Sequence, residues 1–96
     1  MIIGTLRIRL LLRQAKSLKD KRQVVRSIKD RLHNEFNVSV AEIESQDNRQ
    51  LAVLGLALVT SDAHHAKTEL SKIVEALRAH PVAELVDHDI DTMSAN

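Results

Sequence analysis

Basic side chains recur every three or four residues in one segment of the sequence, at Lys19, Arg22, Arg26, Lys29 and His33. Residues at this spacing lie on one face of a helix, so the segment predicts a continuous basic stripe. A row of cations suits contacts with the phosphate oxygens of a nucleic acid, which depend on charge rather than on base sequence. An ordinary solvated helix surface is the alternative interpretation, with Asp30 partly neutralising Arg26.

Charge is distributed unevenly along the 96 residues, although the formal net charge is only +1. Residues 1–35 contain ten Lys and Arg residues against three acids, which is a net charge of +7. The remainder contains four against ten, which is a net charge of −6. Such asymmetry is typical of a polyanion-binding surface, unless the two halves neutralise each other across the fold.

Motifs for catalysis and for metal binding are missing from the sequence. It has no Gly-x-Ser-x-Gly elbow and no glycine-rich phosphate loop, because its only glycines are Gly4 and Gly55. It has no cysteine, and its five histidines show no ligand spacing such as His-x-x-x-His. We therefore expect a binding protein rather than an enzyme, without a cofactor or a metal.

The length and the opening segment predict the class of protein and its location. Ninety-six residues suffice for one domain with one core. The absence of cysteine suits a reducing compartment. Arg7 and Arg9 interrupt the apolar opening segment, so we expect neither a signal peptide nor a membrane span. Together these observations predict a cytoplasmic protein with no membrane partner.

Hydrophobic periodicity predicts six secondary-structure elements. Alternation and β-branched residues predict four strands, at residues 2–12, 38–44, 51–60 and 82–91. Helical spacing predicts a first helix over residues 18–35, with an apolar stripe of Leu18, Val25, Ile28 and Leu32. Ser17 caps this helix, and a second helix runs between the cap Asp62 and Pro81. The polar residues 45–50 form a hairpin loop.

The order βαββαβ predicts an α+β ferredoxin-like sandwich, a four-stranded antiparallel sheet with two helices on one face. The first and third strands are central, and the second and fourth are edges. Residues 1–92 form the single domain, and residues 93–96 a frayed tail. In this topology the start of the first helix, the hairpin around Asp47 and the turn at His80 and Pro81 lie at one pole. We expect the binding site there.

Two stretches resemble the YlxP-like family of small bacterial proteins, namely Ser17-Leu18-Lys19-Asp20-Lys21-Arg22 and Asn37 to Glu42 with Gln46-Asp47. The resemblance covers nearly the whole chain and implies a ferredoxin-like fold. The genes of the family often lie among those for translation initiation and ribosome maturation, which implies a partner on the ribosome or RNA. Relatives more often have Glu at the position of Asp20, and often Trp before the hairpin Gln. Here Arg49 precedes Gln50, and an arginine could stack or meet phosphate.

Two functions remain open from the sequence. The leading hypothesis is an accessory protein that binds RNA or a ribosomal subunit through phosphate contacts of Arg13, Lys16, Lys19, Arg22, Arg26, Lys29 and Arg49. Phe36 is the only aromatic residue, so this binding would not depend on base stacking. The alternative is a protein-interaction or regulatory module that forms a homodimer through its open sheet face. In the strand 51–60, Val53, Ala57 and Val59 would be apolar on one face and Leu54, Leu56 and Leu58 on the other.

Overall fold

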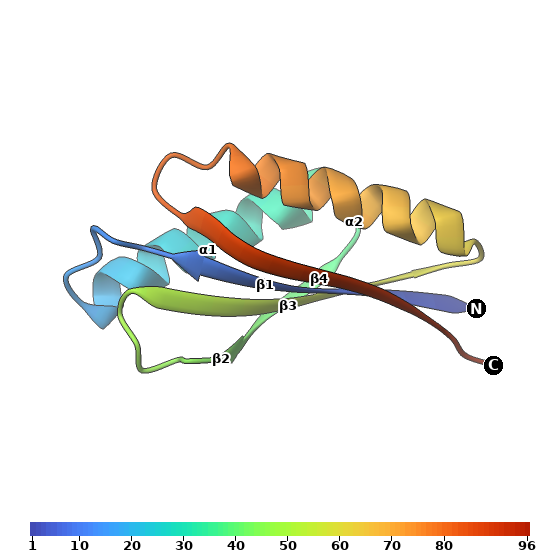
Figure 1. Ribbon diagram of the computed structural model, residues 1–96, viewed down its shortest axis with the longest axis horizontal. Helices are drawn as coiled ribbons and strands as arrows, with labels where there is room; N and C mark the ends of the chain where they lie inside the picture. The colour runs from blue at the N-terminus through green and yellow to red at the C-terminus, as the bar shows by residue number, and fades with distance from the viewer.

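The computed structural model describes residues 1–96 and shows six elements in the predicted order (Figure 1). The strands are β1 (Ile2–Leu11), β2 (Ser39–Glu44), β3 (Leu51–Thr60) and β4 (Glu84–Ser94). The helices are α1 (Leu18–Glu35) and α2 (Ala63–Arg78). The predicted βαββαβ order is therefore confirmed, with α1 and β3 at their predicted boundaries and the other elements within three residues of theirs.

The four strands form one antiparallel sheet in the order β2-β3-β1-β4. β1 pairs along its whole length with β3, from Ile2 opposite Thr60 to Leu11 opposite Leu51. Its other side pairs with β4, so β1 and β3 are central and β2 and β4 are the edges. Both helices lie on the same face of the sheet (Figure 1). This arrangement confirms the ferredoxin-like fold.

The core lies between the helices and one face of the sheet. Alternate residues of β1, namely Leu6, Ile8 and Leu10, are buried beneath the helices, as the period of two predicts. Leu54, Leu56 and Leu58 of β3 join them in one apolar cluster. From the helices come Val25, Ile28, Leu32, Leu70, Ile73 and Leu77. Burying a side chain of this size stabilises the fold by about 1.5–3 kcal/mol.

Gly4 allows α2 to pack closely on β1. A Cβ atom built there would lie 3.1 Å from the Cβ of Ala66 and 3.1 Å from a methyl group of Leu70. Both neighbours belong to the face of α2 that is fully buried. The glycine therefore allows close packing of the helix on the sheet, a common role of glycine within a strand.

The C-terminal strand is longer than predicted. β4 continues past Asp91 to Ser94, and Met93 and Ser94 pair with Ile3 and Ile2 of β1. The amide of Ala95 also donates a hydrogen bond of 2.8 Å to the carbonyl of Met1. The expectation of a frayed tail over residues 93–96 is thus wrong for Met93 and Ser94. The physical reason is that β1 begins at Ile2, so its backbone groups need partners on the β4 side as well.

Candidate nucleic-acid interface

One end of the molecule gathers three connections that are distant in sequence. The β2–β3 hairpin loop, the start of α1 and the turn between α2 and β4 all lie opposite the chain termini, at the left in Figure 1. The hairpin is joined to the β1–α1 connection by two hydrogen bonds. The amide of Leu12 donates to the carbonyl of Gln50 at 2.7 Å, and the side chain of Gln50 donates to the carbonyl of Arg13 at 3.2 Å. The predicted pole therefore exists.

An open groove of about 940 Å³ runs between the start of α1 and the hairpin loop. Lys16, Ser17 and Leu18 line one side, and the loop residues 45–50 line the other. The groove thus brings together Lys16 and Arg49, two of the cations predicted to contact phosphate. Arg13 instead lines a separate groove of about 440 Å³ with His80 and Pro81.

Most of the predicted phosphate contacts make no ion pair within the protein. Six of the seven have no carboxylate within ion-pair distance, namely Lys16, Lys19, Arg22, Arg26, Lys29 and Arg49. All six are exposed except Lys29, which is half-buried. Arg13 is the exception, because its Nε donates to the carboxylate of Glu84 at 2.9 Å. Asp30 makes no ion pair with Arg26, so Arg26 stays available.

The first turn of α1 is capped by its own side chains. Ser17 Oγ accepts a hydrogen bond of 3.1 Å from the amide of Asp20, and the carboxylate of Asp20 accepts one of 2.9 Å from the amide of Lys16. The negative charge of Asp20 also offsets the positive end of the helix macrodipole. The caps thus occupy backbone amides that a phosphate at a helix N-terminus would otherwise use. Anion contacts here depend on the side chains of Lys16 and Lys19.

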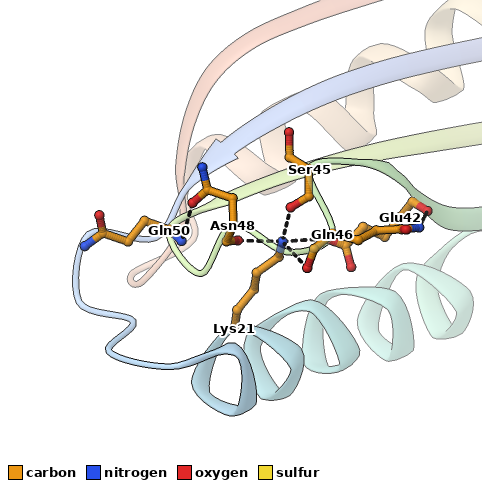
Figure 2. A network of polar contacts seen from close by, with 6 residues as sticks. All are labelled: Lys21, Glu42, Ser45, Gln46, Asn48 and Gln50. Atoms are coloured by element: carbon orange, nitrogen blue, oxygen red, sulfur yellow. Dashed lines mark hydrogen bonds and ion pairs between the residues drawn. The ribbon is translucent and has the colours of Figure 1, made fainter.

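Lys21 is the charged residue that the sequence analysis did not place in the site. Its side chain is 1% exposed and points from α1 into the hairpin loop (Figure 2). Its Nζ lies 2.8 Å from the carbonyl oxygen of Ser45, 2.7 Å from that of Asn48 and 3.4 Å from that of Gln46. The carboxylate of Glu42 on β2 is 2.7 Å away. An ammonium group has three N–H donors. Three of the four oxygens lie within 2.8 Å of Nζ, and the carbonyl oxygen of Gln46 is more distant.

Glu42 and Lys21 depend on each other for their charge balance. The Glu42 oxygen that faces Lys21 is buried and has no other partner than this ammonium group. A buried carboxylate or ammonium without a partner is strongly unfavourable, so each group offsets the cost of burying the other. This pair ties α1 to the end of β2, where the hairpin begins.

A signal for Lys21 is present in the sequence. The apolar stripe of α1 has Leu18, Val25, Ile28 and Leu32, and Lys21 occupies the helical position between the first two. A lysine on the apolar face of a helix must either reach water or find acceptors. The periodicity therefore indicates that Lys21 differs from Lys19 and Lys29 of the basic stripe. It does not indicate which segment supplies the acceptors of Lys21.

His80 shapes the turn between α2 and β4. Its Nδ1 accepts hydrogen bonds from the amides of Val82 at 3.2 Å and Ala83 at 3.1 Å. Desolvation lowers the pKa of His80 from its ordinary value of 6.5, and the positive charge of Arg31 lowers it further. The neutral ring is the form that can accept at Nδ1, so the hydrogen bonds and the pKa agree.

We expect the stability of the protein to fall on mild acidification because of His80. Well above pH 6.5 the side chain is neutral in both states and contributes no pH dependence. As the pH falls below 6.5, the unfolded chain takes up the proton first, and the free energy of unfolding decreases until the pH passes the lowered pKa. Urea denaturation at several pH values between 7.5 and 5 measures this. His80→Asn retains an acceptor and should show a shallower pH dependence; equal dependence in both proteins would contradict the assignment.

The structure contains neither a metal-binding cluster nor a membrane-spanning helix. Nowhere do three or more His, Asp or Glu side chains come close enough to hold a metal ion. Neither helix combines the length and the apolar character needed to cross a membrane.

Comparison with known proteins identifies the family of the chain. A family model described as a protein of unknown function, DUF503, matches residues 3–90. The uncharacterised protein YlxP of Bacillus subtilis (strain 168) is 35% identical over 83 residues, which cover 86% of this chain and 90% of that protein. The stretch from Ser17 to Arg22 and the hairpin at Gln46 and Asp47, which suggested the resemblance, are joined in space by Lys21. The chain belongs to the DUF503 family, which includes YlxP-like proteins.

Proposed function

We propose that this protein is a non-enzymatic accessory factor that binds RNA or a ribosomal subunit through its basic surface. The basic surface consists of the six cations without ion pairs together with Arg13, that is Arg13, Lys16, Lys19, Arg22, Arg26, Lys29 and Arg49. The observation that supports the proposal is that these six exposed or half-exposed cations lie along α1 and at the hairpin groove with no internal carboxylate to neutralise them. The proposal places the protein in the cytoplasm.

The geometry of the stripe suits a row of phosphates. Lys19 and Lys29 are ten residues apart in α1, which corresponds to about 15 Å of helix axis. In B-form DNA one strand presents a phosphate roughly every 3.4 Å of axis, so a stripe of this length reaches several phosphates of one strand. Unpaired cations release counterions from the nucleic acid without first breaking an ion pair of their own. Arg13 would have to give up Glu84 and contributes least.

The scarcity of aromatic residues limits how this surface could recognise a nucleic acid. Phe36 is the only aromatic residue, and it is half-buried against the core. Bases therefore have no aromatic platform, and binding should depend on phosphates and on the shape of a structured RNA. The choice of RNA rather than DNA rests on the gene neighbourhood of YlxP-like proteins.

Binding to a structured RNA or to ribosomal subunits should weaken steeply with salt. If six cations contact phosphate, affinity should fall by about three orders of magnitude between 50 and 200 mM monovalent salt. Electrophoretic mobility or fluorescence anisotropy at four salt concentrations measures the slope. Salt-insensitive binding, or no binding at 50 mM, would refute the proposal.

Self-association through the open sheet face is the second candidate function. The face opposite the helices has a groove of about 550 Å³, formed in part by the small residues Ala41, Gly55 and Ala57. Val59 and Met93 near one end of this face are 64% and 50% exposed. Exposed apolar side chains next to a groove are typical of a contact surface, and a second copy of the chain is the occupant that we propose.

The charged residues of this face make self-association a weaker candidate function than RNA binding. Arg7 crosses the face to pair with Glu44 at 2.8 Å, and Val53 is already buried there without a partner protein. Light scattering over a hundredfold range of concentration decides the matter. A dimer that dissociates in Val59→Lys supports the candidate, whereas a monomer at the highest concentration excludes it.

A further inference from the structure

The conformation of the hairpin loop depends on contacts with a single side chain of α1. Lys21 Nζ is within 3.4 Å of three carbonyl oxygens of the loop, those of Ser45, Gln46 and Asn48 (Figure 2). The remaining bonds of the loop are either local, such as that from the amide of Asn48 to the carbonyl of Ser45 at 3.0 Å, or join Gln50 to the β1–α1 connection. No other residue of α1 donates a hydrogen bond to the loop. Lys21 is therefore what holds the loop against the helix.

Backbone strain at the start of the loop makes this contact necessary. Ser45 has a φ of 58°, in the left-handed region that residues other than glycine rarely adopt. Such a strained conformation persists only where neighbouring contacts enforce it. The carbonyl of Ser45 is one of the short acceptors of Lys21, at 2.8 Å. The ammonium group thus stabilises the strained residue directly.

The segment that Lys21 holds includes Arg49 of the basic surface. Asn48, which precedes Arg49, is bound by Lys21 at 2.7 Å. Gln50, which follows it, donates its amide to the side chain of Asn48 at 3.0 Å and bonds to the β1–α1 connection. Arg49 is consequently fixed on both sides, at the groove that it shares with Lys16.

We infer that Lys21 is a positioning residue of the phosphate-binding surface, and that it contacts no phosphate itself. Its role is to hold the loop from Ser45 to Gln50 so that Arg49 stays beside Lys16 at the hairpin groove. This inference rests on the proposed function for its consequence in binding, but its structural part concerns the free protein. The charge of Lys21 is used inside the molecule, while its neighbours Lys19 and Arg22 face solvent.

Amide hydrogen exchange in the free protein tests the structural part. In Lys21→Met, the amides of Asn48 and Gln50 should exchange at least tenfold faster. The exchange rates of the core amides of β1 and β3 should change only as much as the global free energy of unfolding requires. Glu42→Gln removes the ion pair but leaves Lys21 in place, so this variant replaces Lys21→Met in the test if Lys21→Met does not fold. The loop amides of Glu42→Gln should also exchange faster, but by a smaller factor. Lys29→Met is the matched control on the same helix. Loop exchange that equals the control in both variants would overturn the inference.

A double-mutant comparison tests the consequence for binding. Arg49→Ala should lower the log–log salt slope of RNA binding by about one unit in the wild type. In the Lys21→Met or Glu42→Gln background the same substitution should change the slope by less than half as much, because Arg49 is no longer held at the groove. Lys29→Met and Arg49→Ala should instead be additive, since Lys29 does not touch the loop.

The two tests separate the failure of this inference from the failure of the proposed function. Faster loop exchange with additive binding effects means that Lys21 only stabilises the loop, and it overturns the positioning role. Faster loop exchange in a protein that binds no RNA refutes the proposed function and, with it, the part of the inference that concerns phosphate binding. Faster loop exchange with non-additive binding supports both.

Discussion

Replacing Lys21 with methionine should lower the free energy of unfolding by about 2–4 kcal/mol, the largest stability effect that we expect from any charged residue. The substitution leaves a buried oxygen of Glu42 and the carbonyls of Ser45 and Asn48 without their donor. Removing one partner of a buried pair costs about 3–5 kcal/mol, and we lower this range because the Glu42 side chain is 18% exposed. Methionine fills a similar volume, so little of the effect comes from a cavity.

Urea denaturation followed by circular dichroism measures this effect. Lys19→Met is the control, because Lys19 is exposed on the same helix and makes no ion pair. Its free energy of unfolding should change by no more than about 0.5 kcal/mol. If Lys21→Met is as stable as Lys19→Met, the contacts of Lys21 Nζ with Glu42, Ser45 and Asn48 do not contribute to the stability of the protein, and the prediction is wrong.

Reversing the charge of Arg22 and Arg26 together should weaken RNA binding by at least about 60-fold at 0.1 M salt. Each phosphate contact contributes a slope of about 0.9, so two contacts are worth a factor of about 60 between 0.1 M and 1 M salt. The introduced glutamates add repulsion to this loss. Both arginines are exposed and unpaired, so stability should change within about 0.5 kcal/mol per site.

Lys67 and Lys72 on α2 provide a control with the same change of net charge. Both are exposed, and only Lys72 makes an ion pair, with Glu69 at 3.0 Å, which as a surface pair contributes about 0–1 kcal/mol. Reversing them should reduce binding by only a fewfold. Equal weakening by both double variants would show that net charge alone matters, and no weakening by either would show that the stripe of α1 is ordinary solvated surface.

The fold could be predicted from the sequence because each element buries one face. Leu6, Ile8 and Leu10 alternate, and the apolar residues of α2 recur at helical spacing, so period and order together restrict the topology. The caps Ser17 and Asp62 were predicted for a local reason as well, since their side chains bind amides two or three residues away. The end of β4 could not be predicted, because Met93 and Ser94 are ordered by pairing with Ile3 and Ile2.

The sequence predicted that the hairpin and the start of α1 lie together, but not all of the contacts that their charged residues make. The topology brings the hairpin to the start of α1, so Lys16 and Arg49 were correctly expected at one pole. Arg13 pairs with Glu84, 71 residues away in the chain. Neither the residues around Arg13 nor those around Glu84 indicate this pairing. It depends on how the β1–α1 connection lies against the start of β4.

Local periodicity by itself determined the element types, their order and the basic face of α1, because those properties depend on residues three or four positions apart. The tertiary structure alone decided what each charge does. Lys19, Lys21 and Arg22 are neighbours of similar chemistry, but only Lys21 points toward the hairpin, where the carbonyls of Ser45 and Asn48 and the carboxylate of Glu42 remove it from water. A lysine is buried or solvated according to the acceptors that meet it, and those acceptors come from a segment more than twenty residues away in the chain.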